Sequence, residues 1–495
     1  MTFPPDSGFC HGSGFFRPPT RHPTNGPFVR YISTRGAAPA LGFEDVLLTG
    51  LARDGGLYLP EQWPVFTREE IAAFAGMSYE DVAVRVMKPY VGGEIPEADL
   101  AAIVADAYAT FNHRVVTPLV QIGPADWILE LFHGPTLAFK DVAMQVLSRL
   151  MDRALTSRGR TATIVGATSG DTGGAAIEAF RGRDAIDIFM LFPEGRVSDV
   201  QRRQMTTPGE ANVHAIAVQG TFDDCQNIVK ALFNDLAFRD RLGLAGVNSI
   251  NWARLMAQIV YYFTSAVALG APGRLISFCV PTGNFGDVLA GYAAKRMGLP
   301  VDRLVIATNV NDILARMLET GRYESREVAA TFSPSMDIQI SSNFERLLFE
   351  LTGRNAERVN ALMRELSERG SFALTQGEHG QLTEGFDAER TDEATTLATI
   401  RLLEAATGYL ADPHTAVAVS AAGRVPRRSD VPMVTLATAH PAKFPDAMRR
   451  AVGRVPAEPE TVARQRTLHE RVTVLPNDAA VIARHIAALA RAGRA

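Results

Sequence analysis

Cysteine is scarce in this chain, and the few cysteines present form no recognisable pattern. Cys10, Cys225 and Cys279 are far apart in the sequence and odd in number. Such spacing fits neither a disulfide framework nor a zinc site. We therefore expect a reducing, cytoplasmic environment and no bound metal.

Long apolar runs and an excess of charge are missing as well. No apolar stretch reaches the roughly 18 residues that a membrane-spanning helix requires. The formal net charge of −4 for 495 residues provides no electrostatic footprint for nucleic acid or an anionic membrane. The composition, 46% hydrophobic and 21% charged, is typical of a globular protein with a large core. We expect neither nucleic acid nor a membrane as partner.

Apolar periodicity is absent from residues 1–29, which are rich in proline, glycine, phenylalanine and arginine. We predict that they form a disordered N-terminal extension outside the fold. The following residues, 30–115, show helical spacing of apolar side chains at 69–75, 79–87 and 97–108. They are predicted to form a mainly helical N-terminal domain.

Beyond residue 115 the sequence alternates between apolar strands, glycine-rich turns and helices. This alternation predicts an α/β fold in which helices cover both faces of a parallel sheet. Residues 310–400 lack strand periodicity, so we expect a helical insertion there, and a helical tail is expected after the last strand. The predicted strands are 127–131, 163–167, 186–192, 213–218, 275–280, 304–308 and 433–437.

One lysine stands out in the segment 133–141, whose sequence is HGPTLAFKD. Lys140 follows three apolar residues and opens a helical run at 142–147. Apolar surroundings and a helix N-terminus both disfavour the ammonium form, and a neutral lysine amine can bind an aldehyde cofactor covalently. A surface lysine near a helix start is the alternative that this segment alone leaves open.

Two glycine-rich turns, 168–174 and 281–287, connect a predicted strand to a predicted helix. Neither contains the dinucleotide-binding order Gly-x-Gly-x-x-Gly or the Gly-Lys-Ser/Thr of a P-loop. In 281–287, backbone N–H groups at a helix start and the Asn284 side chain can bind a phosphate. The turn lacks a cation, which suits a permanently held phosphoester, and a purely structural tight turn is the alternative.

The turn 168–174 carries hydroxyl groups instead. Thr168, Ser169 and Thr172, together with the helix-start N–H groups, form a neutral cradle for a carboxylate. Asp171 would repel such a ligand, so it is either a helix N-cap or the partner of a hydroxyl or a cation.

Polar residues on one helix and after the last strand complete the candidate site. Asn251, Arg254 and Gln258 lie on one face of an otherwise apolar helix. They predict either a buried anion site or a structural salt bridge of the arginine. Thr438 and Lys443 follow the last strand, at the edge of the sheet where open α/β proteins bind ligands.

Taken in order, these segments resemble the longer bacterial and fungal type of the threonine synthase family. The likeness extends from Tyr31 to about Arg450 and leaves out the first 29 residues. It implies the α/β fold of type II pyridoxal-phosphate enzymes, which resembles that of the tryptophan synthase β subunit. The segments that carry the resemblance are 31–36, 43–60, 133–141, 168–173, 248–258, 281–286, 333–346 and 438–444.

The resemblance also implies two domains rich in parallel sheet, in addition to the helical N-terminal domain. A large cofactor-binding domain is expected from residues 116–140 and 213–495, with the insertion at about 310–400. A smaller α/β domain is expected from residues 141–212, and it would carry the turn that holds the substrate carboxylate.

The family's site residues transfer to matching positions of this chain. Pyridoxal 5′-phosphate is the implied cofactor, and Lys140 is the implied catalytic residue, which would carry it as a Schiff base and shuttle protons. Thr438 would bond the pyridine nitrogen, and Arg254 would contact the phosphate that leaves. Asp171 occupies the place where shorter relatives have an asparagine. The implied cofactor-binding residues are Lys140, Thr282, Gly283, Asn284, Phe285, Gly286 and Thr438, and the implied substrate-binding residues are Thr168, Ser169, Asp171, Thr172, Arg254 and Lys443.

The implied reaction converts O-phospho-L-homoserine and water into L-threonine and phosphate, by γ-elimination followed by addition of water at Cβ. A related phospho-lyase that releases a 2-oxo acid and ammonia would share the cofactor segments. A threonine or serine dehydratase would share them too, but the segment 333–346 disfavours it. The alternative outside the enzymes is a non-catalytic anion-binding or scaffold protein that has kept the fold. The oligomeric state stays open between monomer and dimer.

Overall fold

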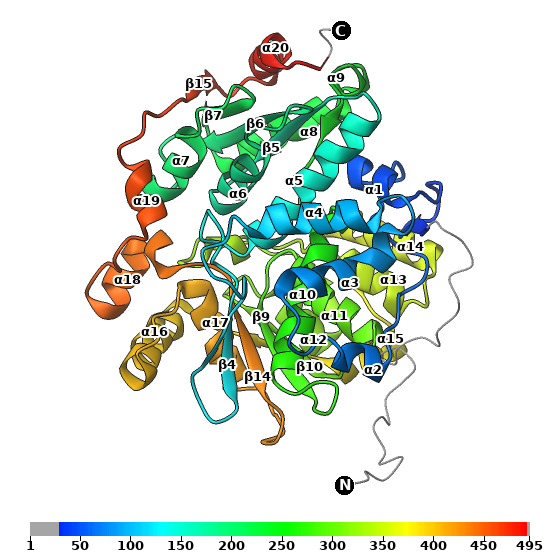
Figure 1. Cartoon of the computed structure of the whole chain (residues 1–495), viewed down its shortest axis with the longest axis vertical. Helices are drawn as coiled ribbons and strands as arrows, with labels where there is room; N and C mark the ends of the chain where they lie inside the picture. Colours follow the sequence, from blue (N-terminus) through cyan, green and yellow to red (C-terminus); the bar gives the residue numbers. More distant parts are fainter. Residues whose placement is uncertain (1–28, 493–495) are drawn as a thin grey trace.

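The computed structural model of the chain describes residues 29–492 (Figure 1). Except for Val29, the predicted N-terminal extension lies outside the described residues. Within 29–492, no helix is both long and apolar enough to cross a membrane. The larger of the two main sheets, which are mostly parallel, occupies the lower half of the view in Figure 1, and the smaller one occupies the upper half.

Six strands form the larger sheet, in the order β13-β10-β9-β14-β4-β3. All neighbouring pairs are parallel except β3 and β4 at one edge. The central strands β9 and β14 are buried along their whole length, as expected where helices cover both faces. The predicted α/β fold with a parallel sheet is confirmed. The strands are β3 (Leu119–Gln121), β4 (Asp126–Glu130), β9 (Ile276–Pro281), β10 (Val301–Thr308), β13 (Phe386–Arg390) and β14 (Met433–Ala437).

Five strands form the smaller sheet, in the order β15-β7-β6-β5-β8, and all of them are parallel. This differs from the predicted domain division, which assigned residues 213–495 to the large domain. β7 pairs with β6, and β15 returns from the C-terminal tail to pair with β7. The assignment is wrong for these strands because apolar periodicity identifies a strand but not its partner. The strands are β5 (Ala162–Ala167), β6 (Ile186–Pro193), β7 (Val213–Gln219), β8 (Leu244–Ala245) and β15 (Thr473–Pro476).

Helices predominate in the N-terminal region, next to a two-stranded antiparallel sheet. Their starts are encoded locally, since the side chains of Thr67 and Ser78 each accept a backbone N–H and cap a helix. Tyr31 Oη donates to Tyr90 O at 2.7 Å and ties this sheet to the helices. The elements are β1 (Tyr31–Ser33), α1 (Phe43–Thr49), β2 (Tyr58–Pro60), α2 (Arg68–Ala72), α3 (Tyr79–Val91) and α4 (Glu97–Tyr108).

The segment 310–400 contains strands as well as helices, so the expectation of a strand-free insertion is wrong. β11 and β12 form a separate antiparallel pair, and β13 is an edge strand of the larger sheet. β13 has the sequence FDAER, and charged residues of this kind protect an edge strand but obscure its periodicity. The other elements are α12 (Ile313–Thr320), β11 (Arg322–Glu324), η1 (Pro334–Met336), α13 (Phe344–Leu351), α14 (Ala356–Arg369), β12 (Ser371–Ala373), α15 (Gln376–Gly385) and α16 (Glu393–Thr407).

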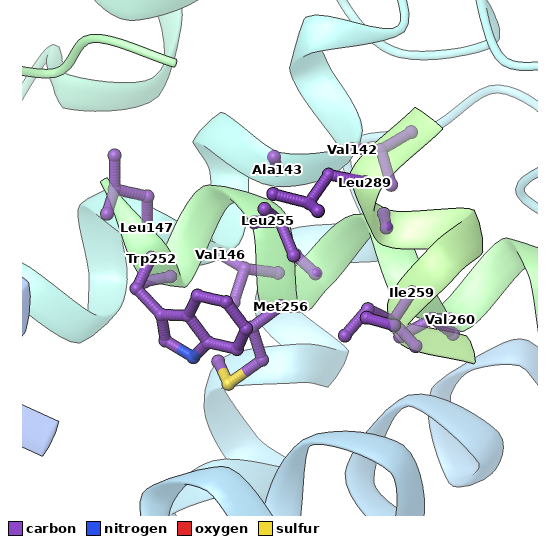
Figure 2. Close-up of a cluster of buried hydrophobic side chains, with 14 of the residues drawn as sticks. Val142, Ala143, Val146, Leu147, Trp252, Leu255, Met256, Ile259, Val260 and Leu289 are labelled. Carbon is purple, nitrogen blue, oxygen red and sulfur yellow. The ribbon is translucent and has the colours of Figure 1, made fainter. Parts of the chain in front are cut away.

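The main core lies around α5 (Lys140–Ser157), α10 (Trp252–Ala268) and α11 (Gly286–Arg296). Figure 2 shows side chains of these three helices gathered into one apolar cluster that includes Val146, Trp252 and Leu289. Each large aliphatic side chain buried here contributes about 1.5–3 kcal/mol. Because α5 begins at Lys140 and Arg254 lies in the first turn of α10, this core also fixes the starts of these helices.

The remaining helices flank the two sheets, and the predicted helical tail is interrupted by β15. They are α6 (Asp171–Phe180), α7 (Asp199–Thr206), α8 (Phe222–Asn234), α9 (Leu236–Leu242), α17 (Pro413–Ala422), η2 (Pro441–Lys443), α18 (Pro445–Val452), α19 (Glu460–Gln465) and α20 (Ala479–Leu489).

Candidate active site

Lys140 lies at the carboxyl-terminal edge of the larger sheet, where the turn after β4 enters α5. The N–H of Phe139 donates to Thr438 O at 2.8 Å, so the chain that follows β14 meets this turn beside the lysine. Lys140 is 7% exposed, which excludes the alternative of a surface lysine. Burial lowers the pKa of Lys140, Asp171 opposes this shift, and the positive charge of Lys443 adds to it.

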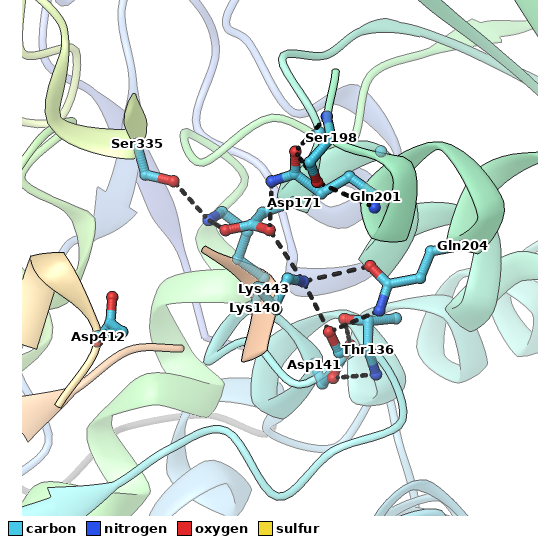
Figure 3. A network of polar contacts seen from close by, with 12 residues as sticks. Thr136, Lys140, Asp141, Asp171, Ser198, Gln201, Gln204, Ser335, Asp412 and Lys443 are labelled. Carbon is cyan, nitrogen blue, oxygen red and sulfur yellow. Dashed lines mark hydrogen bonds and ion pairs between the residues drawn. The ribbon is translucent and has the colours of Figure 1, made fainter. Parts of the chain in front are cut away.

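A buried carboxylate, Asp171, faces Lys140 from the start of α6 (Figure 3). Asp171 Oδ2 lies 3.7 Å from Lys140 Nζ, and Oδ1 lies 2.9 Å from Lys443 Nζ. Gln201 Nε2 donates to Oδ1 at 3.0 Å. Burial alone would raise the pKa of Asp171, but the two lysines outweigh it and hold that pKa well below its usual range. Asp171 is therefore a partner of cations, while Gly170 takes the N-cap position.

All three hydrogens of the Lys443 ammonium are used inside the protein. Nζ donates to Asp171 Oδ1, to Thr136 O at 2.7 Å and to Gln204 Oε1 at 3.2 Å. The Lys443 side chain is 0% exposed. A direct contact between Lys443 and the substrate, as expected from the sequence, would break one of these bonds. The geometry disfavours that contact and makes Lys443 the group that holds Asp171 in place.

The turn 282–286, here named the phosphate turn, leads from β9 into α11 and presents free backbone donors. Among the described residues, the N–H groups of Gly283, Asn284 and Phe285 donate to no protein acceptor. They precede the first turn of a helix whose dipole favours an anion. Phe285 has a φ of 62°, a strained left-handed conformation that is frequent at functional turns. The phosphate turn can therefore hold a phosphate group.

The segment 333–346, here named the serine segment, packs directly on the phosphate turn. Asn343 Nδ2 donates to Asn284 O at 3.0 Å, and Ser341 Oγ donates to Gly283 O at 2.7 Å. These bonds use carbonyl groups of the phosphate turn, so they support its shape and leave its N–H groups free.

Ser335, near the start of the serine segment, makes a contact that the sequence did not indicate. Its Oγ accepts a hydrogen bond from Lys140 Nζ at 3.4 Å. The segment was expected only to distinguish the family, and a Ser-Pro-Ser sequence gives no sign that one hydroxyl reaches a lysine 195 positions away.

Arg254 is a buried cation without an acidic partner. Its Nη1 donates to Val247 O at 3.0 Å, and its Nε has no hydrogen-bond partner in the described structure. Burial lowers the pKa of the guanidinium to about 10, and no charged group of the described residues offsets this. The alternative of a structural salt bridge is thus excluded. Gln258 Oε1 is also unpartnered, whereas Asn251 caps the start of α10 by accepting the N–H of Ala253.

The hydroxyl groups of the 168–174 turn have different surroundings. Thr168 Oγ1 accepts the N–H groups of Gly170 and Gly173, both at 2.9 Å, and so fixes the shape of the turn. Ser169 is exposed and Thr172 is half-buried. Of these three hydroxyls, the one on Ser169 is therefore the most accessible to a ligand.

These features fit pyridoxal phosphate. A buried lysine with a lowered pKa provides an amine that can react with an aldehyde. The phosphate turn provides backbone donors that lack a protein partner. Thr438 is buried beside Lys140 and provides a neutral hydroxyl at the end of β14. The residues present can thus hold the cofactor at its aldehyde, phosphate and ring.

Gly283→Ala is expected to weaken cofactor binding. A Cβ at residue 283 would lie 2.6 Å from Ser335 O, a backbone atom of the serine segment. Overpacking of this kind costs about 1–3 kcal/mol, which corresponds to about 5- to 150-fold in cofactor affinity. Titration of the apoprotein with pyridoxal phosphate measures this loss. Gly209→Ala is the control, because its Cβ would meet nothing within 4 Å. Equal affinities in both variants would contradict a close fit at residue 283.

Three family models match successive parts of the chain. "Threonine synthase N terminus" matches residues 30–108, "Pyridoxal-phosphate dependent enzyme" matches residues 111–377, and "Threonine synthase, C-terminal" matches residues 415–486. The second includes Lys140 and the phosphate turn. The cofactor of this family is pyridoxal phosphate, as the sequence predicted.

Individual relatives agree with these matches. The chain is 53% identical to a threonine synthase of Pseudomonas aeruginosa, over 92% of this chain and 97% of the relative. It is 44% identical to a threonine synthase of Saccharomyces cerevisiae, over 85% of this chain and 89% of the relative. A crystal structure of PLP-bound threonine synthase from Brucella melitensis is 58% identical and superposes with a TM-score of 0.92, over 94% of this chain and 100% of that one. This chain belongs to the threonine synthase family.

Proposed function

We propose that this protein converts O-phospho-L-homoserine and water into L-threonine and phosphate. The observation that carries the proposal is that Arg254 is a buried cation without an acidic partner. Its charge also acts on Lys140. Arg254 can therefore bind a second anion besides the cofactor phosphate. A substrate with a carboxylate at one end and a phosphate at the other matches this arrangement. Small-molecule binding of this kind also agrees with the names of the relatives.

Lys140 is the proposed base. When bound, pyridoxal phosphate stores the electron pair that remains after a bond at the substrate Cα breaks. Lys140 Nζ takes the proton from Cα and passes it on to the reacting group, which makes the amine neutral again. It can then take a second proton, from Cβ. Because burial lowers the pKa of Lys140, a larger fraction of its amine is neutral at neutral pH than in an exposed lysine. Asp171 Oδ2 lies 3.7 Å from Nζ, and its negative charge stabilises the Lys140 ammonium that forms when Nζ takes up a proton.

Arg254 is the proposed partner of the departing phosphate. A guanidinium can bind two phosphate oxygens, and in a buried site it offsets the negative charge that develops as the Cγ–O bond breaks. Lys443, the other cation near Lys140, has no donor left for this purpose. The remaining roles proposed from the sequence are a bond from Thr438 to the cofactor ring nitrogen and contacts of the 168–174 turn with the substrate carboxylate.

Arg254→Met is expected to lower kcat/KM for O-phospho-L-homoserine by about 10²- to 10³-fold, the usual loss when one donor to a developing anion is removed. Inhibition by inorganic phosphate should weaken in parallel, while the absorbance of the bound cofactor stays the same. Arg254→Lys, which keeps the charge, should recover part of the activity. If the variant loses cofactor and keeps its sensitivity to phosphate, then Arg254 serves the cofactor phosphate instead.

Product analysis tests the proposed reaction as a whole. The holoenzyme incubated with O-phospho-L-homoserine should release threonine and phosphate in equal amounts. A 2-oxo acid with ammonia would identify the related phospho-lyase, which shares Lys140 and the phosphate turn. Release of neither set of products by protein that contains cofactor would reject the substrate.

The small-molecule substrate is thus the partner that the site supports. The cytoplasmic location, the choice between monomer and dimer, and the assignment of the remaining residues to large and small domains stay predictions. Size-exclusion chromatography with light scattering measures the oligomeric state directly.

A further inference from the structure

The hydroxyl of Ser335 faces the amine of Lys140 from an element that carries no other proposed site residue. Ser335 Oγ accepts a hydrogen bond from Lys140 Nζ at 3.4 Å (Figure 3). The nearest charged group, Asp171, is itself engaged by Lys443 and Gln201. Ser335 is therefore a neutral acceptor placed on Nζ, and its position depends on the turn η1 that carries it.

His414 fixes this turn from α17. The N–H of Ser335 donates to His414 Nε2 at 3.2 Å, and because a backbone N–H can only donate, Nε2 carries no proton. The ring proton lies on Nδ1, which donates to Asp412 Oδ2 at 2.7 Å. Asp412 and His414 are 1% and 3% exposed, so water does not compete for these bonds. A neutral histidine thus orients the backbone of Ser335.

A second set of contacts holds the other side of η1. Asp337 accepts the N–H of Thr331 at 2.9 Å and Nδ2 of Asn309 at 2.8 Å. The same Nδ2 donates to Ser333 Oγ at 2.9 Å. These bonds fix both flanks of the turn, so the hydroxyl at its centre points in a defined direction.

We infer that Ser335 is a positioning residue for Lys140 and that Asp412 and His414 hold it in place. The inference rests on the proposed function, in which Lys140 Nζ takes protons from the substrate. A neutral lysine amine has a single lone pair, which must point at the proton to be removed. By accepting one N–H of Nζ, Ser335 Oγ turns this lone pair toward the substrate and places no further charge beside the amine.

Ser335→Ala in the holoenzyme tests the inference. We expect full cofactor content, a KM that is little changed, and a kcat that is lower by about 10- to 100-fold, the loss typical of a misplaced catalytic group. Exchange of the substrate Cα proton with deuterated water should slow by the same factor. Ser335→Thr, which keeps the hydroxyl, should restore most of the rate. Ser367→Ala, on an exposed position of α14, is the matched control.

The apoprotein provides a measurement that is independent of turnover. Lys140 Nζ must also be oriented to attack the aldehyde of pyridoxal phosphate. Covalent uptake of the cofactor by Ser335→Ala apoprotein should therefore be slower by about 10-fold or more, while the final cofactor content equals that of the wild type.

Substitutions of His414 test how Ser335 is held. The short side chain of His414→Asn can bond Asp412 but cannot reach the N–H of Ser335. His414→Gln can place an amide oxygen where Nε2 now lies. We expect the first variant to reproduce the loss of kcat and the second to keep most of the rate. Combining His414→Asn with Ser335→Ala should add little further loss, because both act on one hydroxyl.

Two outcomes would overturn the inference. One is a Ser335→Ala variant whose kcat and exchange rate are unchanged. The other is a Ser335→Ala variant that loses bound cofactor but keeps the rate per bound cofactor. Failure of the proposed function looks different, because the wild-type holoenzyme would then form no threonine from O-phospho-L-homoserine. In that case the rate of covalent cofactor uptake still shows whether Ser335 orients Lys140.

Discussion

Lys140→Ala should retain bound pyridoxal phosphate and lose turnover by about 10⁴-fold or more, since both the covalent attachment and the proton transfers depend on its amine. The phosphate turn does not include the lysine, and its unpaired N–H groups remain available to the cofactor. The variant should therefore bind cofactor without the absorbance of the lysine-bound form. Steady-state kinetics and equilibrium dialysis measure the two effects separately.

The matched control for this variant is Lys230→Ala, because Lys230 is an exposed lysine on α8. It should leave kcat, KM and the cofactor spectrum unchanged. A kcat of more than about 1% of the wild-type value in Lys140→Ala would be far above the residual rate expected after the loss of a catalytic base and nucleophile. Another group would then have to be the base.

Asp171→Ala should cost about 3–5 kcal/mol of the free energy of unfolding, the range found when one partner of a buried ion pair is removed. The reason is Lys443, whose ammonium is 0% exposed and would keep only the neutral acceptors Thr136 O and Gln204 Oε1. Urea unfolding of the apoprotein, followed by tryptophan fluorescence, measures this loss.

The acid dependence of this loss has a defined sign. The folded-state pKa of Asp171 lies well below its usual value, because the two lysines outweigh the effect of burial. Its carboxylate therefore adds stability at pH values above about 4, and this contribution is lost as the pH falls toward the folded-state pKa. The difference in unfolding free energy between wild type and Asp171→Ala should be largest near neutral pH and shrink in acid.

A double variant separates the ion pair from other effects of the substitution. Asp171→Ala combined with Lys443→Met removes both charges, so much of the lost stability should return. Lys443→Met alone should also be destabilising, because Asp171 would keep only the more distant Lys140 as a cationic partner. If the double variant lost as much unfolding free energy as the two single variants lose together, the two charges would not be coupled.

The fold and the cofactor could be predicted because their signals are local. Apolar strands followed by glycine-rich turns indicate a parallel sheet wherever they occur, and both sheets here show them. The lysine segment and the phosphate turn are each contiguous in sequence. Together with six other segments in the same order along the chain, they carried the resemblance to the family.

Features that depend on distant residues could not be predicted. The pairing of β15 with β7 joins residues about 260 positions apart, which no periodicity records. Lys443 was expected to face the substrate because it follows the last strand of the larger sheet. The structure shows instead that its three donors are used by Asp171, Thr136 and Gln204, which lie on three other segments.

The contact of Ser335 with Lys140 was missed for a related reason. It requires a turn held by Asp412 and His414, and neither residue is adjacent to it in sequence. Local sequence thus identifies the groups that perform chemistry, whereas the groups that orient them become visible only in three dimensions.

The most direct test of the proposed reaction is the fate of an oxygen label. Holoenzyme and O-phospho-L-homoserine are incubated in ¹⁸O-water, and both products are analysed by mass spectrometry. If phosphate leaves by cleavage of the Cγ–O bond and water adds at Cβ, threonine carries one ¹⁸O in its hydroxyl and the phosphate carries none. Label in the phosphate with unlabelled homoserine, or a 2-oxo acid in place of threonine, would contradict the account.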